Sequence, residues 1–247
     1  MHSVSIVVPA YNEERRLPTS LKAVLAYLAQ RKFDAAEIIV VNDGSSDRTA
    51  DCARLFNASG IAVRLVENGR NRGKGFSVRN GVLSATGGWI LVTDADLSAP
   101  IDQLDLLLTE AEKQQAQVAI GSRALNRALI GVHQPASREY AGRVFNGAMQ
   151  LVTGLPFADT QCGFKLFQAD AARHIFERQQ LDGFGFDVED LFIARLLGIK
   201  TIEVPVRWNN VEGTKVSLAN GLDSFADLLR IRWYQLRGKY REPSASR

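Results

Sequence analysis

Apolar and polar residues alternate in blocks along the first half of the sequence. Short, β-branched, nearly continuous apolar runs begin at Val4, Glu37, Ile61, Trp89 and Val118. Strands that are buried on both faces of a parallel sheet have this composition. Amphipathic helical patterns occupy the intervals, at residues 17–31, 45–56, 73–85 and 101–114. The alternation predicts right-handed βαβ crossovers and therefore an α/β fold with a Rossmann-like, mostly parallel twisted sheet flanked by helices.

The pattern changes after Arg123. A polar stretch at residues 124–137 predicts a long loop, which in a compact domain is usually functional. Later patterns predict helices at 140–154 and 186–198 and strands at 162–167 and 201–208. In the last predicted helix, one stripe carries Leu218, Leu222, Phe225, Leu229, Trp233 and Leu236. We expect a C-terminal amphipathic helix at 218–240, followed by a tail at 241–247.

Composition narrows the class of protein. The 247 residues are enough for one large domain, and 46% hydrophobic with 23% charged residues is typical of a soluble globular protein. The net charge of +3 is too small to indicate nucleic-acid binding. Two distant cysteines indicate neither a disulfide framework nor a zinc site, which favours a reducing compartment. Neither a signal peptide nor a membrane span is evident. We therefore expect a cytoplasmic protein, with contact to the cytoplasmic face of a membrane left open.

Polar residues follow the predicted strands, where an open α/β sheet binds its ligands. The clearest case is Asp94-Ala95-Asp96, directly after a buried apolar run. Residues two apart point the same way in an extended chain, so both carboxylates are expected to face one ligand. Hard cations such as Mg²⁺ and Mn²⁺ take such oxygen ligands. The alternative, aspartates that cap a helix or a turn, suits an isolated motif better than one that follows a buried strand.

The stretch "NRGKG" is a weaker signal. Its glycines would let the backbone approach a ligand, and Arg72 and Lys74 would meet phosphate groups. It lacks the spacing of a dinucleotide-binding or P-loop motif. The start of an ordinary helix is the alternative.

Several motifs, taken together, resemble the family 2 glycosyltransferases. In order along residues 4–215 they are "VVPAYNEE", "VNDGSSDRT", "NRGKG", "DADLSAP", "GSR", "DTQCGFKLF", "GFDVED" and "EVPVRWNNVEGTK". The likeness is greatest to the polyprenyl-phosphate sugar transferases, with dolichyl-phosphate glucosyltransferases ahead of mannosyltransferases. The resemblance implies a GT-A fold, a nucleotide-sugar donor and inversion at the anomeric carbon. It also implies a donor-binding half at 1–123 and an acceptor-side half at 124–217, within one domain at 1–217.

The resemblance assigns roles to residues of this chain. The residues expected around the base and ribose are Pro9, Tyr11, Glu13, Asn42 and Asp43. Asp94 would touch the ribose or the metal, Ala95 leaves backbone room, and Asp96 would bind Mg²⁺ or Mn²⁺ at the diphosphate. The cations expected to offset phosphate charge are Lys74, Arg123 and one of Arg138 or Arg143. Many relatives carry aspartate in place of Asn42, which leaves the selectivity for the base open.

The expected reaction is metal-dependent, inverting transfer of a sugar to a polyprenyl phosphate, with glucose from UDP-glucose favoured. Asp159 would act as a general base or would position the acceptor, and a structural aspartate in a turn is the alternative. The presence of Lys215 makes the chain more similar to the glucosyltransferases than to the relatives that use GDP-mannose. The catalytic set is thus Asp96, Asp159, Arg123 and Lys215. Open alternatives are transfer to a soluble sugar or glycan hydroxyl and a non-catalytic nucleotide-sugar-binding regulator.

The C-terminal helix has a basic end with interfacial aromatic residues. Cations at Arg230, Arg232, Arg237, Lys239 and Arg241 stand nearly unopposed by acids. Such a helix can lie on an anionic bilayer, which predicts peripheral membrane contact. The alternative is a solvated charged end whose apolar stripe packs on the domain.

Overall fold

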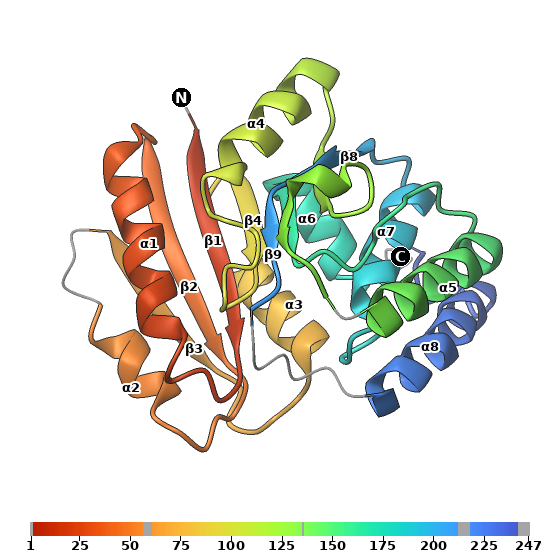
Figure 1. The fold of residues 1–247 in the computed structure, drawn as a ribbon, viewed down its shortest axis with the longest axis horizontal. Coiled ribbons are helices and arrows are strands. Elements are labelled where there is room, and N and C mark those ends of the chain that lie inside the picture. Colours follow the sequence, from red (N-terminus) through yellow and green to blue (C-terminus); the bar gives the residue numbers. More distant parts are fainter. Residues whose placement is uncertain (1, 57–60, 135, 212–217, 242–247) are drawn as a thin grey trace, which may run out of the picture.

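A computed structural model describes residues 2–56, 61–134, 136–211 and 218–241. Its centre is a seven-stranded sheet in the order β3-β2-β1-β4-β7-β5-β8 (Figure 1). Neighbouring strands are parallel except β7, which is antiparallel to both β4 and β5. The strands are β1 (Ser3–Ala10), β2 (Ala35–Asn42), β3 (Ala62–Glu67), β4 (Trp89–Thr93), β5 (Val118–Ser122), β7 (Phe164–Gln168) and β8 (Thr201–Pro205). The predicted α/β fold with a mostly parallel sheet is confirmed.

The order of the strands fixes where ligands can bind. From β1 the chain moves outward to β2 and β3, and then crosses back to place β4 on the other side of β1. This reversal is a topological switch point, and the crevice at the carboxyl ends of β1 and β4 is the usual ligand site of open α/β sheets. In register, Ala10 lies opposite Asn42, so β1 and β2 end side by side.

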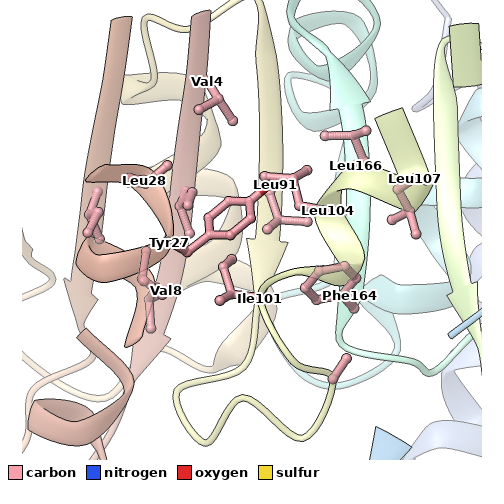
Figure 2. Close-up of a cluster of buried hydrophobic side chains, with 14 of the residues drawn as sticks. Val4, Val8, Tyr27, Leu28, Leu91, Ile101, Leu104, Leu107, Phe164 and Leu166 are labelled. Atoms are coloured by element: carbon pink, nitrogen blue, oxygen red, sulfur yellow. The ribbon is translucent and has the colours of Figure 1, made fainter. Parts of the chain in front are cut away.

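Helices cover both faces of the sheet, and each layer has its own apolar core. One layer contains α1 (Leu17–Gln30), α2 (Thr49–Arg54) and α4 (Gln103–Gln114). The other contains α3 (Lys74–Ser84), α5 (Ala136–Thr153), α6 (Ala169–Phe176), α7 (Phe186–Leu196) and α8 (Leu218–Leu236). In the first layer, Leu28 of α1 and Leu104 and Leu107 of α4 pack with Leu91 and Leu166 of the sheet (Figure 2). The nearly continuous apolar strands thus bury both faces, as their composition predicts.

The second half departs from prediction in three places. The stretch predicted as a loop contains the 3₁₀ turn η1 (Arg127–Leu129) and the short strand β6 (Ile130–Val132). β6 pairs with β9 (Trp208–Asn209) in a separate two-stranded sheet. Helix α6 was not predicted, because it is only eight residues long. It nevertheless has a buried apolar face, formed by Ala171, Ala172, Ile175 and Phe176. The division of the chain near residue 123 stays a prediction.

The C-terminal helix forms, as α8, within the range predicted for it. Among the side chains of α8 that the structure describes, Leu228 and Ile231 are the buried apolar ones, whereas Leu229, Trp233 and Leu236 of the predicted stripe are exposed. The side chains of Leu218 and Leu222 lie outside the description. None of the helices in the described ranges has the length and hydropathy needed to cross a membrane.

Candidate active site

The carboxyl ends of β1 and β2 bring together the first group of predicted residues. Pro9 lies near the end of β1, and the partly exposed Tyr11 follows it. The side chain of the buried Asn42 accepts a hydrogen bond from the Ser45 amide at 3.1 Å. The amide of Asp43 donates to the carbonyl of Ala10 at 2.9 Å, which ties the two strand ends together.

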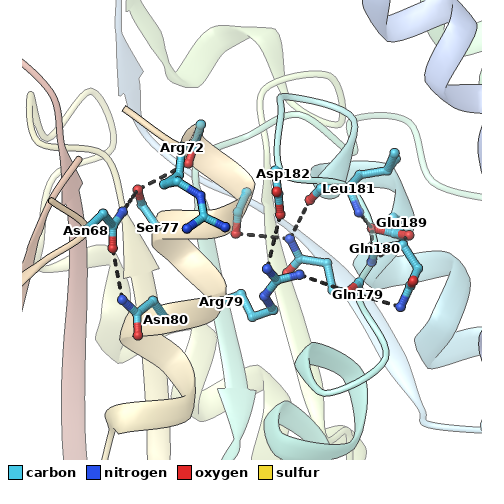
Figure 3. Close-up of polar contacts among 12 residues, drawn as sticks. Asn68, Arg72, Ser77, Arg79, Asn80, Gln179, Gln180, Leu181, Asp182 and Glu189 are labelled. Atoms are coloured by element: carbon cyan, nitrogen blue, oxygen red, sulfur yellow. Dashed lines mark hydrogen bonds and ion pairs between the residues drawn. The ribbon is translucent and has the colours of Figure 1, made fainter. Parts of the chain in front are cut away.

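Asp43 is directed into the protein and organises the glycine-rich loop. Its carboxylate accepts hydrogen bonds from the Arg72 and Gly73 amides at 2.9 Å and from the Asn68 side chain at 2.8 Å. Gly73 has a φ of +106°, and a Cβ atom there would lie 2.3 Å from the carbonyl oxygen of Asp182. The glycines of "NRGKG" therefore let this loop approach the chain's own segment near Asp182. Figure 3 shows that this segment is also held by Arg79, which donates a hydrogen bond to Asp182.

Asp94 lies between a lysine and a glycine. Lys74, the first residue of α3, places its Nζ 2.7 Å from Asp94 Oδ1. A Cβ atom on Gly163 would lie 2.0 Å from Asp94 Oδ2, so only glycine leaves room for this carboxylate. Burial alone would lower the pKa of Lys74, but Asp94, Asp187 and Asp96 together raise it above its usual value. Lys74 is therefore a fixed positive charge at the end of β4.

Asp96 belongs to a turn and is not in an extended chain as expected. The amide of Leu97 donates to the Asp94 carbonyl, and Leu97 has a φ of +48°. Asp96 Oδ1 accepts hydrogen bonds from Ser98, and its Oδ2 lies 3.7 Å from Arg16 Nη1. Burial and the neighbouring charge of Asp94 raise the pKa of Asp96, against the opposing effects of Ser98 and Arg16. Asp94 is thus close enough to disfavour the charge of Asp96.

Arg16 is a functional candidate that is not among the residues predicted from the sequence. Its guanidinium forms two hydrogen bonds of 2.6 Å with Glu13, and this interaction together with Asp96 and Asp94 raises the pKa of Arg16. The spacing of Glu13 and Arg16, three apart before α1, is the signal that could have found it. The contact with Asp96 depends on the tertiary fold.

The acid pair suits a hard divalent cation with few protein ligands. Asp94 and Asp96 offer carboxylate oxygens, and their mutual repulsion would be relieved by a dication. In the part of the chain that the structure describes, no three His, Cys, Asp or Glu side chains are grouped so as to hold a metal. Mg²⁺ commonly binds through one or two carboxylates plus substrate phosphates, and this donor set fits that mode.

Arg123 and Asp159 form a second charged pair at the end of β5. Nε and Nη2 of Arg123 donate to the two carboxylate oxygens of Asp159 at 2.6 and 2.7 Å, and the Arg123 amide adds a bond of 3.0 Å. Burial would raise the pKa of Asp159, but Arg123 outweighs burial and the net shift is downward. Burial likewise opposes the charge of Arg123, yet Asp159 and, more weakly, Cys162 and Asp94 raise its pKa. Asp159 is therefore ionised and already engaged.

A fully buried charge network lies behind the site. Lys165 Nζ donates to Asp187 Oδ1 at 2.6 Å and to Asp190 Oδ2 at 3.2 Å. The ring of Phe186 lies beside both this network and the site, with Lys74 and Lys165 at 5.8 and 5.6 Å from its centroid. The sequence pattern does not identify Lys165, since nothing in "CGFKLF" shows that its lysine points inward.

The structure does not place three of the predicted cations beside Asp94, Asp96 and Asp159. Arg143 is exposed on α5. Lys215 lies outside the described residues, and the side chain of Arg138 is likewise outside the description. Their roles stay predictions. At the ends of β4 and β5 the structure places the pairs Lys74–Asp94 and Arg123–Asp159 together with Asp96, and Ala95 lies in the turn between the two acids.

A sheet with a topological switch point, carrying an acid pair and several cations at its carboxyl edge, defines a class of proteins that bind phosphorylated donors. Residues 5–176 match the family model described as "Glycosyl transferase family 2". The chain belongs to this family, and it is a glycosyltransferase.

Similar proteins and similar solved structures are also sugar-transferring enzymes. The chain is 38% identical over 92% of its length to a dolichyl-phosphate beta-glucosyltransferase of Trichomonas vaginalis, covering 72% of that protein. It is 37% identical over 96% of its length to the dolichyl-phosphate beta-glucosyltransferase of Mus musculus, covering 77% of it. A glucosyl-3-phosphoglycerate synthase from Mycobacterium tuberculosis, crystallised with Mn²⁺, UDP-glucose and phosphoglyceric acid, superposes with a TM-score of 0.68 at 19% identity, covering 93% of this chain and 79% of the synthase. The fold is thus the GT-A fold.

Proposed function

We propose that this glycosyltransferase moves glucose from UDP-glucose to dolichyl phosphate or a related polyprenyl phosphate, with inversion at the anomeric carbon. The names of relatives that are similar over nearly the whole chain support the sugar and the acceptor. The observation that carries the proposal is the pairing of each acid after β4 with a cation from another element. These contacts are Lys74–Asp94 and Arg16–Asp96.

The cations would act on the leaving group. When the bond from the anomeric carbon to the diphosphate breaks, negative charge builds on the diphosphate. The negative charge of Asp94 helps to raise the pKa values of three cations, Lys74, Arg16 and Arg123. These side chains therefore keep their positive charge. Preorganised charges of this kind stabilise a developing charge without reorganising during the reaction. Residues beside the ends of β1 and β2, among them Tyr11 and Asn42, would hold the base and ribose.

Mg²⁺ or Mn²⁺ would be held by Asp94 and Asp96. A bound dication supplies charge neutralisation at the departing diphosphate. In its presence, Lys74 would exchange part of its contact with Asp94 for a phosphate oxygen of the donor, which the partial exposure of this pair permits.

The acceptor would need alignment more than deprotonation. A phosphate acceptor is already an anion, so it requires no general base. Asp159 has a lowered pKa and both its oxygens bonded to Arg123. We therefore assign Asp159 the positioning of Arg123, and Arg123 the offsetting of phosphate charge. Since the acceptor is a lipid and Cys52 and Cys162 are both free, we place the reaction at the cytoplasmic face of a membrane.

The test uses purified full-length chain, labelled UDP-glucose and a polyprenyl phosphate in detergent, with GDP-mannose and soluble glycans as competing substrates. We expect label in the lipid fraction, loss of transfer with EDTA, and recovery with Mg²⁺ or Mn²⁺. Asp96→Asn should lower turnover about 100-fold or more without changing the unfolding midpoint. Lys113→Gln, an exposed change on α4, is the matched control.

Each contrary result identifies an alternative. Label on a soluble glycan would replace the lipid acceptor with a hydroxyl acceptor. Transfer from GDP-mannose alone would make the protein a mannosyltransferase. Thermal stabilisation by nucleotide without transfer to any acceptor would indicate a donor-binding regulator.

A further inference from the structure

The first turn of α3, which carries Lys74, is held by a segment that lies far away in the sequence. Gly73, the residue before the helix, makes no side-chain capping hydrogen bond. The first N–H groups of a helix have no partner within the helix and must find one elsewhere. Here the amide of Phe76 donates to the carbonyl of Asp182 at 3.1 Å. Asp182 belongs to residues 179–183, which we call the clamp segment.

Gln179 joins the clamp segment to the same turn of α3. This residue is only 2% exposed, and its Nε2 donates to the carbonyl of Gly75 at 3.0 Å and to that of Leu181 at 2.7 Å. Figure 3 shows Gln179 and Leu181 beside α3. One buried amide thus bonds the helix start and the clamp segment to each other. Its loss would leave both carbonyls without this donor, which costs free energy in a buried place.

The packing between α3 and the clamp segment requires a glycine at position 75. A Cβ atom on Gly75 would lie 2.6 Å from the carbonyl oxygen of Leu181 and 2.8 Å from that of Gly183. It would also lie 2.8 Å from Cβ of Phe186, the first residue of α7. Cβ atoms do not approach other atoms this closely, so the clamp segment would have to shift. The two backbones therefore pack directly on each other at Gly75.

The clamp segment is bonded to α7 as well as to α3. The fully buried carboxylate of Glu189 accepts hydrogen bonds from the amides of Gln180 at 3.1 Å and Leu181 at 2.8 Å. Arg79 of α3 adds a contact, since its Nη1 donates to the carbonyl of Gln179 at 3.0 Å. The clamp segment is thus fixed between two helices, and it transmits the position of α7 to the start of α3.

Lys74 is the side chain whose place depends on this arrangement. Its Nζ lies 2.7 Å from Asp94 Oδ1. Because Lys74 is bonded to Gly75, a displacement of this turn moves the ammonium group relative to Asp94. We propose that Gln179 is a positioning residue for the transfer reaction, which locks the clamp segment to α3 and so holds Lys74 where the donor diphosphate binds. The diphosphate at Lys74 rests on the proposed function, whereas the locking contact does not.

A double-mutant cycle between Gln179 and Lys74 tests this role in the full chain. Gln179→Met keeps the length of the side chain and removes both hydrogen bonds. We expect kcat/KM for UDP-glucose to fall about tenfold, because a misplaced charge loses rate, while KM for the lipid acceptor stays the same. In a Lys74→Met background the same change should lower kcat/KM less than about twofold, since the group that Gln179 positions is gone.

The affinity for UDP with Mn²⁺, measured by titration calorimetry on the same four chains, should show the same coupling. Gln180→Met is the matched control, because the Gln180 amide bonds the carbonyls of Arg178 and Gln179 within its own stretch of chain. It should leave both kcat/KM and the UDP affinity unchanged.

A pair of glycine substitutions tests the packing independently. Gly75→Ala pushes the clamp segment away from α3 and should lower kcat/KM for UDP-glucose about tenfold, again with little effect in the Lys74→Met background. Gly183→Ala adds the same methyl group to the exposed side of the clamp segment, where a Cβ atom meets nothing within 4 Å. This control should behave as the unchanged chain does.

The outcomes separate the positioning role from the proposed function. Equal fold losses with and without Lys74, together with a lower unfolding midpoint, would make Gln179 merely structural and overturn the proposal. Unchanged kinetics and UDP affinity in Gln179→Met, or an equal loss in Gln180→Met, would overturn it too. Coupling in UDP affinity without glucose transfer by any chain would contradict the proposed function and support the positioning role. Glucose transfer with independent effects of the two substitutions would give the reverse.

Discussion

Two lysine–aspartate pairs in this molecule have nearly the same geometry and very different surroundings. Lys74–Asp94 is 2.7 Å long with side chains 20% and 37% exposed. Lys165–Asp187 is 2.6 Å long with side chains 2% and 6% exposed. The ring of Phe186 lies near both lysines. The partly exposed pair can exchange partners with a ligand, whereas the buried pair is shielded from solvent and shares its lysine with Asp190. The degree of burial, and not the contact distance, therefore distinguishes a lysine that can bind a ligand from a lysine that is structural.

Lys165→Met is the change with the largest expected effect on stability. It leaves the carboxylates of Asp187 and Asp190 buried without their cation, which typically costs about 3–5 kcal/mol. Urea denaturation should show this loss in the free energy of unfolding. The control is Lys74→Met, the same substitution in the partly exposed pair, which should change stability by about 1 kcal/mol or less. Equal losses of unfolding free energy in the two variants would mean that burial does not distinguish the two lysine–aspartate pairs.

Lys74→Met should instead lower activity. We expect kcat/KM for UDP-glucose to fall about 100-fold, because a fixed positive charge beside the diphosphate is lost. The measurement is steady-state transfer with the donor concentration varied. Lys74→Arg keeps the charge and should recover part of the rate. Unchanged kinetics in Lys74→Met would place the donor phosphates elsewhere.

The sequence predicts the fold more completely than the site. Continuous apolar strands and amphipathic helices predict the α/β sheet, because burial of both sheet faces depends mainly on composition. The antiparallel direction of β7 does not follow from "FKLF", since a short buried strand has the same composition in either direction. The sequence identifies the apolar stripe on α8 but leaves open whether it packs on the domain, because helical spacing does not show what covers a stripe.

At the site, strand ends predict which residues come close but not which atoms pair. Asp94 and Asp96 follow β4 as expected, and Arg123 follows β5. The choice of Lys74 for Asp94 and Arg16 for Asp96 depends on how three separate elements meet. These long-range pairings come from tertiary packing, which local sequence patterns do not contain.

Glu189 is a buried acid whose hydrogen-bond donors are neutral, unlike the acids that pair with Lys74 and Lys165. It accepts hydrogen bonds from the Leu181 amide at 2.8 Å and the Tyr240 hydroxyl at 2.7 Å. Burial raises the pKa of Glu189 from 4.5 to about 7. The folded chain then binds a proton more tightly than the unfolded chain does. Its contribution to stability is therefore complete below about pH 4.5 and is lost as the pH rises through 7.

Glu189→Gln should flatten this pH dependence. Between pH 4.5 and 7, the unfolding free energy of the unchanged chain should fall more steeply than that of the variant, by up to about 3 kcal/mol in total. Urea melts at a series of pH values measure the difference. Some slope should remain in the variant, since burial also raises the pKa of Asp190 to about 7. Parallel curves would mean that Glu189 does not titrate in this range.

Arg123 and Asp159 are intermediate between the two regions, with side chains 26% and 8% exposed. Arg123→Lys keeps the charge but replaces a two-point contact with one. We expect kcat/KM for the lipid acceptor to fall about tenfold, with donor affinity and the unfolding midpoint nearly unchanged. Acceptor titrations at saturating UDP-glucose, beside urea melts of the same variant, separate these effects. If stability fell as far as in Lys165→Met while the kinetics held, the pair would belong with the buried network, and alignment of the acceptor would need another cation.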